Sequence, residues 1–350
     1  MRAVVYAGPG QVRVDEVSEP KIEDRSDAIV AVASTAICGS DMHLLSGKTP
    51  GMKPGGVIGH EFVGTITQVG DAVSAYRVGQ RVVGSFLIAC GNCRECRARR
   101  FNHCNNRRAL GLGPVAGDLA GAQAEYVRVP RADVNLHALD DSAASLSDEA
   151  ALFAGDILPT GFYAAALADP DPGETAAVVG AGPVGLCTAL ALGLRDRVPI
   201  MVLDSDPRRV AFARALGLDA VDVSAREAES AVAERTDGAM ADVVIEAVGA
   251  PQAFRTAMRC ARSGGRVAVV GVYGSERYEL PMGMTWVRGL DLRFSGMANV
   301  QAHWDAALAA VARGALDPTR LITHRLALED AQEGYELFAS REAMKVVLTP

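Results

Sequence analysis

The sequence predicts an α/β protein in which a doubly wound parallel sheet is joined to a second, β-rich domain. Strands and helices alternate between residues 151 and 295, whereas short strands and turns fill residues 1–150. At 350 residues the chain is too long for one ordinary core, so two domains are expected. The tail, residues 296–350, carries a helix and a closing strand that could return to the first domain.

Composition excludes some classes of partner. The net charge is −7, which argues against a nucleic-acid partner because phosphates would be repelled. Residues 176–194 carry no charge over about the length of a membrane span, but glycines and a proline break them into strand, turn and helix, so no membrane partner is expected. The start of the chain does not resemble an export signal, and a cytoplasmic location is therefore expected.

Residues 1–150 contain short β-rich segments separated by Gly and Pro, with no long helical pattern. The segments expected as strands are MRAVVYAG, VRVDEV, DAIVAVAST, EFVGTITQVG and GQRVVGS. This pattern is typical of an all-β region with loops, such as a partly open barrel.

From about residue 150 the pattern changes to that of repeated strand–helix units. Strands are expected at TAAVVG, PIMVLDSD, ADVVIEAVG, RVAVVGV and LDLRFSG, and helices at PVGLCTALALGL, PRRVAFARALGL and PQAFRTAMRCARSGG, the last closed by its glycines. The tail adds the helix AHWDAALAAVARG and the strand KVVLT.

A glycine-rich turn joins the first of these strands to its helix. Gly180, Gly182 and Gly185 follow the pattern G-x-G-x-x-G, which allows a tight turn, close approach of backbone to a pyrophosphate and close helix–strand packing. Pro183 and Val184 complete the turn and open the helix, whose N-terminus offers amide donors to an anion. The turn therefore predicts a Rossmann-type dinucleotide site, although a purely structural turn remains the alternative.

An acidic residue ends the next strand. Asp204 lies 24 residues after Gly180, where a carboxylate can accept hydrogen bonds from both ribose hydroxyls and would repel a 2′-phosphate. This favours NAD over NADP. Arg208 and Arg209 keep NADP as an alternative because a guanidinium could accommodate that phosphate, and Asp204 could instead cap a helix.

Four of the seven cysteines lie within fifteen residues. Their spacing, C-x2-C-x2-C-x7-C, suits four thiolates converging on one zinc ion, and a site with four protein ligands is structural because it is closed to substrate. The alternative interpretation is that these four cysteines are reactive thiols. His103 is a possible substitute ligand, whereas Cys187 and Cys260 lie in helical patterns and are expected to pack in the core. The expected ligands are Cys90, Cys93, Cys96 and Cys104.

A second set of ligand types is spread along the chain. Cys38 and His60 lie in the β-rich domain, and Asp156 lies in the apolar segment LFAGDILPTGFYAA. Taken alone, Asp156 is most simply a helix cap. A catalytic zinc keeps three protein ligands and one open position, and a carboxylate in an apolar segment needs a compensating cation, so Asp156 is the best candidate for the third ligand.

The motifs CGSDMH, GHEFVG, the four-cysteine segment, TGFYAA and VVGAGPVGL occur in an order and spacing that resemble the zinc-dependent medium-chain alcohol dehydrogenases over essentially the whole chain. The resemblance implies a GroES-like catalytic domain formed by residues 1–150 and 296–350 around a Rossmann domain of residues 151–295, with the active site between them. It also implies a catalytic zinc at Cys38, His60 and Asp156, where many members have a cysteine at the third position. The aspartate is similar to a bacterial subgroup of secondary-alcohol dehydrogenases and glutathione-independent formaldehyde dehydrogenases.

The same resemblance implies roles for neighbouring residues. Glu61 would lie beneath the metal and could exchange onto it. Ser40 would take the hydroxyl proton and pass it through the cofactor ribose to His43; a turn serine and a solvated histidine are the alternatives. Thr160, Gly271 and Gly296 match positions that line the nicotinamide, and Lys345 matches a basic residue that meets the pyrophosphate.

The leading hypothesis is a zinc enzyme that transfers a hydride between a small alcohol and NAD, with two zinc ions per chain. One alternative is a formaldehyde-type dehydrogenase or dismutase that retains its NAD, and another is a non-catalytic protein that binds dinucleotide and zinc. Family members are homodimers or homotetramers, and the stretch at residues 273–284 could supply a subunit contact.

Overall fold

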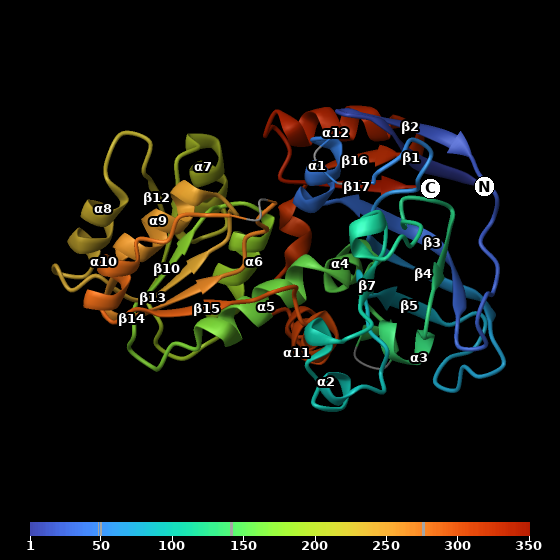
Figure 1. The fold of residues 1–350 in the computed structure, drawn as a ribbon, viewed down its shortest axis with the longest axis horizontal. Helices are drawn as coiled ribbons and strands as arrows, with labels where there is room; N and C mark the ends of the chain where they lie inside the picture. The colour runs from blue at the N-terminus through green and yellow to red at the C-terminus, as the bar shows by residue number, and fades with distance from the viewer. Residues whose placement is uncertain (48, 50, 141–142, 275–276) are drawn as a thin grey trace. The chain divides into compact units, whose positions relative to one another are not determined.

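The structure is a computed structural model that describes residues 1–47, 49, 51–140, 143–274 and 277–350 (Figure 1). The chain divides into two compact units, residues 1–159 with 299–350 and residues 160–298. The sequence predicts the same order of segments, with boundaries at 150/151 and 295/296. The predicted subunit contact at residues 273–284 includes residues 275–276, which lie outside the described residues.

The first unit is built on a sheet in the strand order β16-β17-β3-β4-β5-β9, with β8 also paired to β3. The predicted strands of this region are confirmed as β1 to β5. The strands of the unit are β1 Arg2–Gly8, β2 Gln11–Glu16, β3 Ala28–Ile37, β4 Glu61–Val69, β5 Arg81–Gly84, β6 Leu87–Ile88, β7 Arg108–Ala109, β8 Tyr126–Val129, β9 Leu136–Ala138, β16 Ile322–Ala327 and β17 Lys345–Thr349.

Helices in this unit are mostly short, and two longer ones come from the tail. They are α1 Gly39–Leu45, α2 Arg94–Arg97, α3 Ala132–Asn135, α4 Asp148–Leu152, α11 Val300–Ala312 and α12 Ala331–Ala339, while α5 Ile157–Ala168 crosses the unit boundary. The tail helix α12 and its neighbour strand β16 are not predicted from the sequence. Figure 1 shows α12 beside β16, β17 and β2, and Tyr335 and Phe338 of α12 join the apolar core there.

The register of β3 and β4 positions two candidate ligands. These antiparallel strands pair Ala36 with Glu61, so the end of β3 lies beside the start of β4. Cys38 follows β3 directly after Ile37, and His60 directly precedes β4. Residues that are 22 positions apart are therefore brought together by backbone pairing alone.

The second unit is a parallel sheet in the order β12-β11-β10-β13-β14-β15. Its strands are β10 Ala176–Val179, β11 Ile200–Asp204, β12 Asp219–Asp222, β13 Ala241–Glu246, β14 Ala261–Val269 and β15 Asp291–Phe294. From β10 the chain adds β11 and β12 on one side, and it then crosses to the other side of β10 to add β13, β14 and β15. Ligands of such sheets bind at the carboxyl ends of the strands at the switch point, here between β10 and β13. The predicted doubly wound sheet is confirmed.

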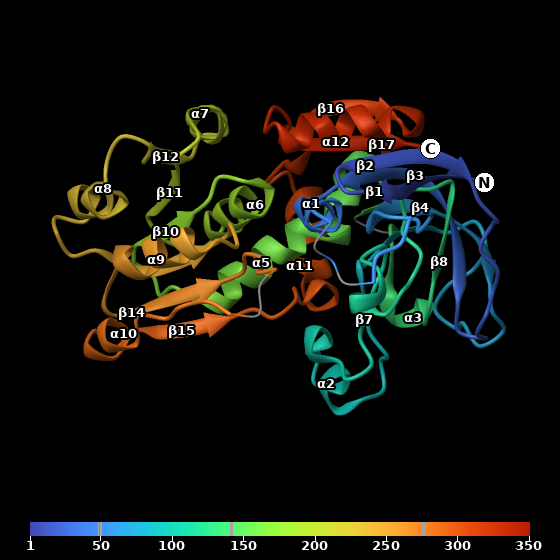
Figure 2. The same cartoon turned by 45° about the horizontal axis from the view of Figure 1, so that its top comes forward.

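Helices cover both faces of this sheet. They are α6 Pro183–Leu192, α7 Pro207–Ala215, α8 Ala228–Arg235, α9 Pro251–Cys260 and α10 Met282–Val287. Figure 2 shows α6 and α7 on one face and α9 on the other, as right-handed crossovers require. The strand β12 and helix α8 are further elements that the sequence reading does not predict.

One predicted helix end is wrong. The sequence places the end of the helix at residues 251–265 on its glycines, but α9 ends at Cys260 and β14 begins at Ala261. The guanidinium of Arg288 donates to the carbonyl oxygens of Met258 (2.7 Å) and Ala261. A side chain from a distant segment, rather than a glycine, therefore satisfies carbonyl groups at this helix end.

The uncharged run at residues 176–194 folds as β10, the glycine turn and α6, as predicted. In the part of the chain that the structure describes, no single helix has the length and apolar character needed to cross a membrane. Asp148–Gly155 and Ile157–Ala168 meet that criterion only as a bent pair taken together.

Candidate functional site

Three predicted ligands from distant parts of the chain converge in the first unit. The Oδ2 atom of Asp156 lies 3.4 Å from Cys38 Sγ and 3.4 Å from His60 Nε2. Glu61 joins them, since one ligand atom from each of the four residues lies within 4.8 Å of the others. All four side chains are buried, and we refer to Cys38, His60, Glu61 and Asp156 as the mixed cluster.

The dimensions of the mixed cluster suit a zinc ion. Tetrahedral zinc with ligands at 2.0–2.3 Å separates its ligand atoms by about 3.3–3.8 Å, close to the observed spacing of sulfur, nitrogen and carboxylate oxygen. The donor set of one thiol, one imidazole and one carboxylate is also one that zinc accepts. The Oε2 atom of Glu61 is buried and has no hydrogen-bond partner among the described residues, so a cation nearby would compensate it.

Charge within the mixed cluster also favours a cation. Burial, and next the Asp156 carboxylate, raise the pKa of the Cys38 thiol. Burial likewise raises the pKa of Glu61, although the ammonium of Lys345 opposes it. Burial acts to lower the pKa of His60, but the carboxylates of Asp41 and Asp156 outweigh it and the pKa is raised. A divalent ion would stabilise the deprotonated form of each ligand at once.

Lys345 has a different position from the one expected. Its side chain is 1% exposed, and its Nζ lies 2.6 Å from Glu61 Oε1. The predicted contact with a pyrophosphate is therefore corrected, because the ammonium is enclosed in the first unit and paired with a buried carboxylate. Lys345 contributes a compensating charge beside the mixed cluster.

Asp41 is a site residue that the sequence reading missed. Its Oδ2 accepts a hydrogen bond from the backbone N–H of Cys38 (3.0 Å), and its Oδ1 lies 3.1 Å from His60 Nδ1. A carboxylate on the second ring nitrogen orients a metal-binding imidazole and leaves Nε2 for the metal. The sequence did carry a signal for this role. Asp41 is an acid at the third position of α1, the helix that begins directly after the ligand Cys38.

Ser40 and His43 lie on the same short helix, α1. Ser40 Oγ is 3.1 Å from His60 Nε2, so the hydroxyl borders the mixed cluster. His43 is one turn further on and exposed, which places both side chains on one face of the helix. Burial of part of the ring lowers the pKa of His43, which favours the neutral imidazole that can accept a proton.

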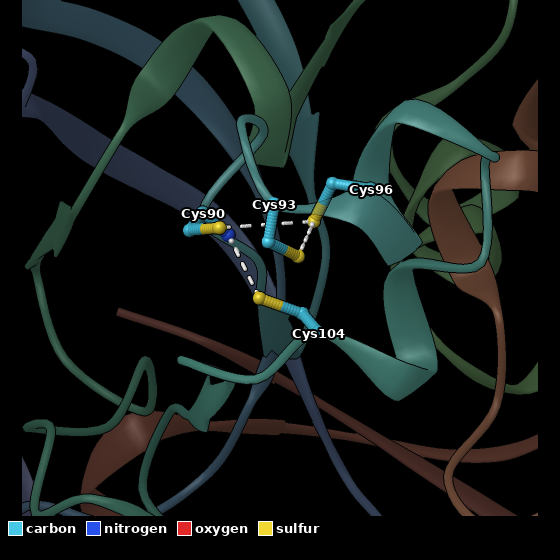
Figure 3. Close-up of side chains that lie close together, drawn as sticks. All are labelled: Cys90, Cys93, Cys96 and Cys104. Carbon is cyan, nitrogen blue, oxygen red and sulfur yellow. Dashed lines mark hydrogen bonds between the residues drawn. The ribbon is translucent and has the colours of Figure 1, made fainter.

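The four predicted thiol ligands form a second cluster, which we call the cysteine lobe (Cys90, Cys93, Cys96 and Cys104). Figure 3 shows their sulfur atoms facing one another. Cys90 Sγ lies 3.9 Å and Cys93 Sγ 3.5 Å from Cys96 Sγ, close to the ~3.8 Å that four thiolates around tetrahedral zinc require. Backbone N–H groups of Cys90 and Asn106 donate to Cys104 Sγ, as suits a thiolate.

The other sulfur and nitrogen candidates lie outside the cysteine lobe. His103 is exposed, and the described metal-binding group at this place consists of the four cysteines. Cys187 and Cys260 are fully buried in the second unit, as expected of packing residues. None of the seven cysteines, all of which are described, forms a disulfide.

The glycine turn of the second unit has the geometry that its pattern predicts. Gly180 has a φ of +108°, and an added Cβ at Gly185 would lie 1.9 Å from the carbonyl oxygen of Gly180. At Gly182, by contrast, the nearest atom to an added Cβ is Arg209 NH1 at 3.8 Å. The first and third glycines are required by the turn, and the space above the second is open at the N-terminus of α6, where an anion can bind.

Asp204 holds this turn in place. Its Oδ2 accepts from the N–H of Ala181 (2.7 Å) and its Oδ1 from the N–H of Asp206 (2.8 Å). The residue that caps α7 is Asp206, whose side chain accepts from the N–H of Arg208, so the helix-cap alternative for Asp204 is wrong.

Further candidates for the cofactor site also lie in the second unit. An added Cβ at Gly271 would lie 2.1 Å from the N of Gly249, so the loops after β13 and β14 touch there. Gly296 has a φ of +65°, and Thr160 is buried at the start of this unit. The sequence reading missed Glu246, a buried carboxylate at the end of β13 that accepts from the N–H groups of Val248 and Gly249, both 2.8 Å away.

Both halves of the chain match known families. Residues 24–140 match the family described as the alcohol dehydrogenase GroES-like domain, and residues 183–313 match the one described as zinc-binding dehydrogenase. The chain is 32% identical, over 380 residues and 100% of both proteins, to AdhB, a zinc-type alcohol dehydrogenase-like protein of Bacillus subtilis (strain 168).

Solved structures resemble the whole chain as well. Alcohol dehydrogenase TADH from Thermus sp. ATN1 is 41% identical with a TM-score of 0.94, covering 100% of this chain and 99% of that one. A protein described as a zinc-binding dehydrogenase from Sinorhizobium meliloti 1021, bound to NADP, is 30% identical with a TM-score of 0.86, covering 100% of this chain and 99% of that one.

Proposed function

The chain belongs to the zinc-dependent medium-chain alcohol dehydrogenase family, and from this premise we propose that it interconverts an alcohol and an aldehyde or ketone with NAD and two zinc ions. It is an oxidoreductase with a GroES-like and a Rossmann-type part that uses zinc and a nicotinamide dinucleotide. The comparisons do not favour the formaldehyde-type dismutase or the non-catalytic alternative.

The observation that carries the proposal is the convergence of Cys38, His60 and Asp156. When bound, a zinc ion there supplies a Lewis acid that lowers the pKa of an alcohol hydroxyl, and the dinucleotide supplies the hydride acceptor. The chain orients the imidazole through Asp41 and places the Ser40 hydroxyl at the ligand nitrogen, where it can accept the substrate proton while it passes its own proton on. His43, exposed on the same helix, can hold that proton next to solvent.

Zinc content and turnover test this assignment together. We expect two zinc ions per chain, and NADH formation measured by absorbance with a panel of primary, secondary, cyclic and sugar-like alcohols. Asp156→Asn keeps the size of the side chain and removes its charge, and should lose one zinc ion and most turnover. Unchanged zinc content and turnover in this variant would remove Asp156 from the ligand set.

The preference for NAD rests on Asp204. Its carboxylate ends β11 beside the glycine turn, where a 2′-phosphate would meet a negative charge. The similarity to a protein bound to NADP makes a direct comparison necessary. We expect kcat/KM to be higher with NAD, and comparable values for the two cofactors would overturn the argument from Asp204.

A homo-oligomer is proposed from the edge of the second unit. The strand β15 ends the sheet order, and large apolar side chains are exposed there and on α10. Trp286 is 80% and Phe294 62% exposed, and an edge strand beside exposed apolar side chains is a ready site for pairing with a second copy. Light scattering should show a dimer or tetramer that Phe294→Lys weakens; a monomeric wild type would overturn this proposal. The expected cytoplasmic location stays a prediction.

A further inference from the structure

A buried tyrosine of the C-terminal tail approaches the mixed cluster from outside its ligand set. Tyr335, on α12, is 2% exposed and packs in an apolar core with Val4, Ile37 and Leu348. Its hydroxyl donates a hydrogen bond to Gln123 Oε1 over 2.8 Å. A hydroxyl in such a core is costly unless it is bonded, so loss of this hydrogen bond would leave a buried polar group unsatisfied.

The side chain of Gln123 lies against both segments that carry ligands. Gln123 is fully buried, and its Nε2 donates to the carbonyl oxygen of Ala36 (3.1 Å), two residues before Cys38. On the other side it packs on Gly59, the residue before His60, where an added Cβ would lie 2.3 Å from Gln123 Cγ. The amide therefore contacts the end of β3 and the approach to β4 together.

The protonation state of the Tyr335 hydroxyl supports its role as a hydrogen-bond donor. Burial, and next the carboxylate of Asp41, raise the pKa of the Tyr335 hydroxyl well above its usual range, so the hydroxyl stays protonated and remains a donor. Asp41 in turn accepts from the N–H of Cys38 and lies 3.1 Å from His60 Nδ1. The hydroxyl of Tyr335 is thus connected through Gln123 to the segments that carry Cys38 and His60.

We propose that Tyr335 and Gln123 are positioning residues for the mixed cluster, whose hydrogen bond holds Cys38 and His60 at metal-binding separation before an ion arrives. Ligands that are already in place lose less conformational freedom on binding and release the ion more slowly. The inference rests on the proposed zinc site at Cys38, His60 and Asp156. It adds the tail helix α12 to the elements that support that site.

Zinc release gives a test that does not depend on turnover. Tyr335→Phe keeps the ring and removes the hydroxyl, and we expect zinc to leave the mixed cluster about 3- to 10-fold faster, below the 10–100-fold effect of a partner that bonds the ligand directly. Release is followed as the absorbance of a chromogenic chelator, without alcohol or dinucleotide. His60→Ala removes a ligand of the mixed cluster, so the chelator signal of that variant reports zinc release from the cysteine lobe alone. This part of the signal should be the same in wild type and Tyr335→Phe.

A matched control separates positioning from packing. The hydroxyl of Tyr76 donates to the carbonyl oxygen of Leu136 in the same unit, on a strand that carries no proposed ligand, so Tyr76→Phe should lower the Tm but leave zinc release unchanged. In the double variant Tyr335→Phe/Gln123→Leu the hydroxyl and its acceptor are both gone, but the carbonyl oxygen of Ala36 also loses its donor, so the Tm should stay low and release should stay fast. If Tyr335→Phe does not fold, Gln123→Met removes the same bond from its other side.

The inference is overturned if zinc leaves Tyr335→Phe at the wild-type rate, or no faster than it leaves Tyr76→Phe. The Tyr335–Gln123 hydrogen bond would then serve only the packing of the core. If the wild-type chain holds zinc only in the cysteine lobe, the proposed function fails first, and the inference fails with it. These two failures are told apart by the zinc content of the wild-type protein before chelator is added.

Discussion

The cysteine lobe and the mixed cluster both gather side chains that could hold a metal ion in the first unit, but the chain assembles them in different ways. The lobe takes its ligands from residues 90–104, so a local fold is enough to form it. The mixed cluster takes Cys38, His60 and Asp156 from the end of β3, the start of β4 and the segment before α5. A continuous stretch thus provides a closed site of four sulfur atoms, and distant elements provide a site of mixed donors.

The surroundings of the two sites differ as well. Backbone N–H groups meet the sulfur of Cys104 in the lobe, whereas charged side chains surround the mixed cluster: Asp41 beside His60, and Lys345 on Glu61. Four protein ligands leave no position for substrate, whereas the three proposed in the mixed cluster, Cys38, His60 and Asp156, leave one open. We propose that the lobe serves stability and the mixed cluster serves the chemistry, and four variants test that division.

The largest effect is expected from His60→Ala. This change removes one ligand of the mixed cluster, and kcat/KM should fall by at least about 10³-fold, equivalent to about 4 kcal/mol of transition-state stabilisation. Elemental analysis should find one zinc ion instead of two, because the cysteine lobe is untouched. Turnover within tenfold of wild type would break the division of roles.

Cys104→Ser should act mainly on stability. Cys104 is fully buried, and loss of the lobe metal should lower the Tm by roughly 5–10 °C, or about 3 kcal/mol, as measured by calorimetry. Turnover well below that temperature should stay within about tenfold of wild type. Cys260→Ser changes a buried thiol outside both clusters and is the matched control, since it should leave two zinc ions bound. Abolished turnover in folded Cys104→Ser would show that the lobe serves the chemistry.

Lys345→Met tests the positive charge that pairs with Glu61 in the mixed cluster. Without the ammonium, Glu61 is left buried and unpaired, its pKa rises further, and zinc affinity should fall by about 10–100-fold in chelator competition. Lys345→Arg keeps the charge and should recover most of the affinity. Equal affinities in wild type and Lys345→Met would remove Lys345 from the electrostatics of the site.

Asp156→Cys should give the smallest effect, and it makes the mixed cluster chemically more like the lobe. A thiolate has the same formal charge as the carboxylate and is an equally good zinc ligand. We expect two zinc ions per chain and turnover within about tenfold of wild type. Loss of one zinc ion here would show that the geometry around Asp156 accepts only an oxygen ligand.

Local pattern was enough to predict much of this molecule. The spacing of Cys90 to Cys104 and the turn at Gly180 to Gly185 each lie on one short stretch, so their geometry follows from neighbouring residues. The strands β1 to β5 and the βαβ alternation were predicted for the same reason, because period and turn residues are local signals. Elements with weak local signals, such as β12 and α8, were missed.

Side-chain partners from distant segments could not be predicted in this way. The sequence by itself determined the fold class, the glycine turn and the types of ligand available. Only the tertiary structure decided that Lys345 pairs with Glu61, that Asp206 rather than Asp204 caps α7, and that Tyr335 reaches Gln123. The physical reason is that a buried polar group must be satisfied by whatever the packed chain brings beside it, and that neighbour is set by strand pairing and helix packing rather than by position in the sequence.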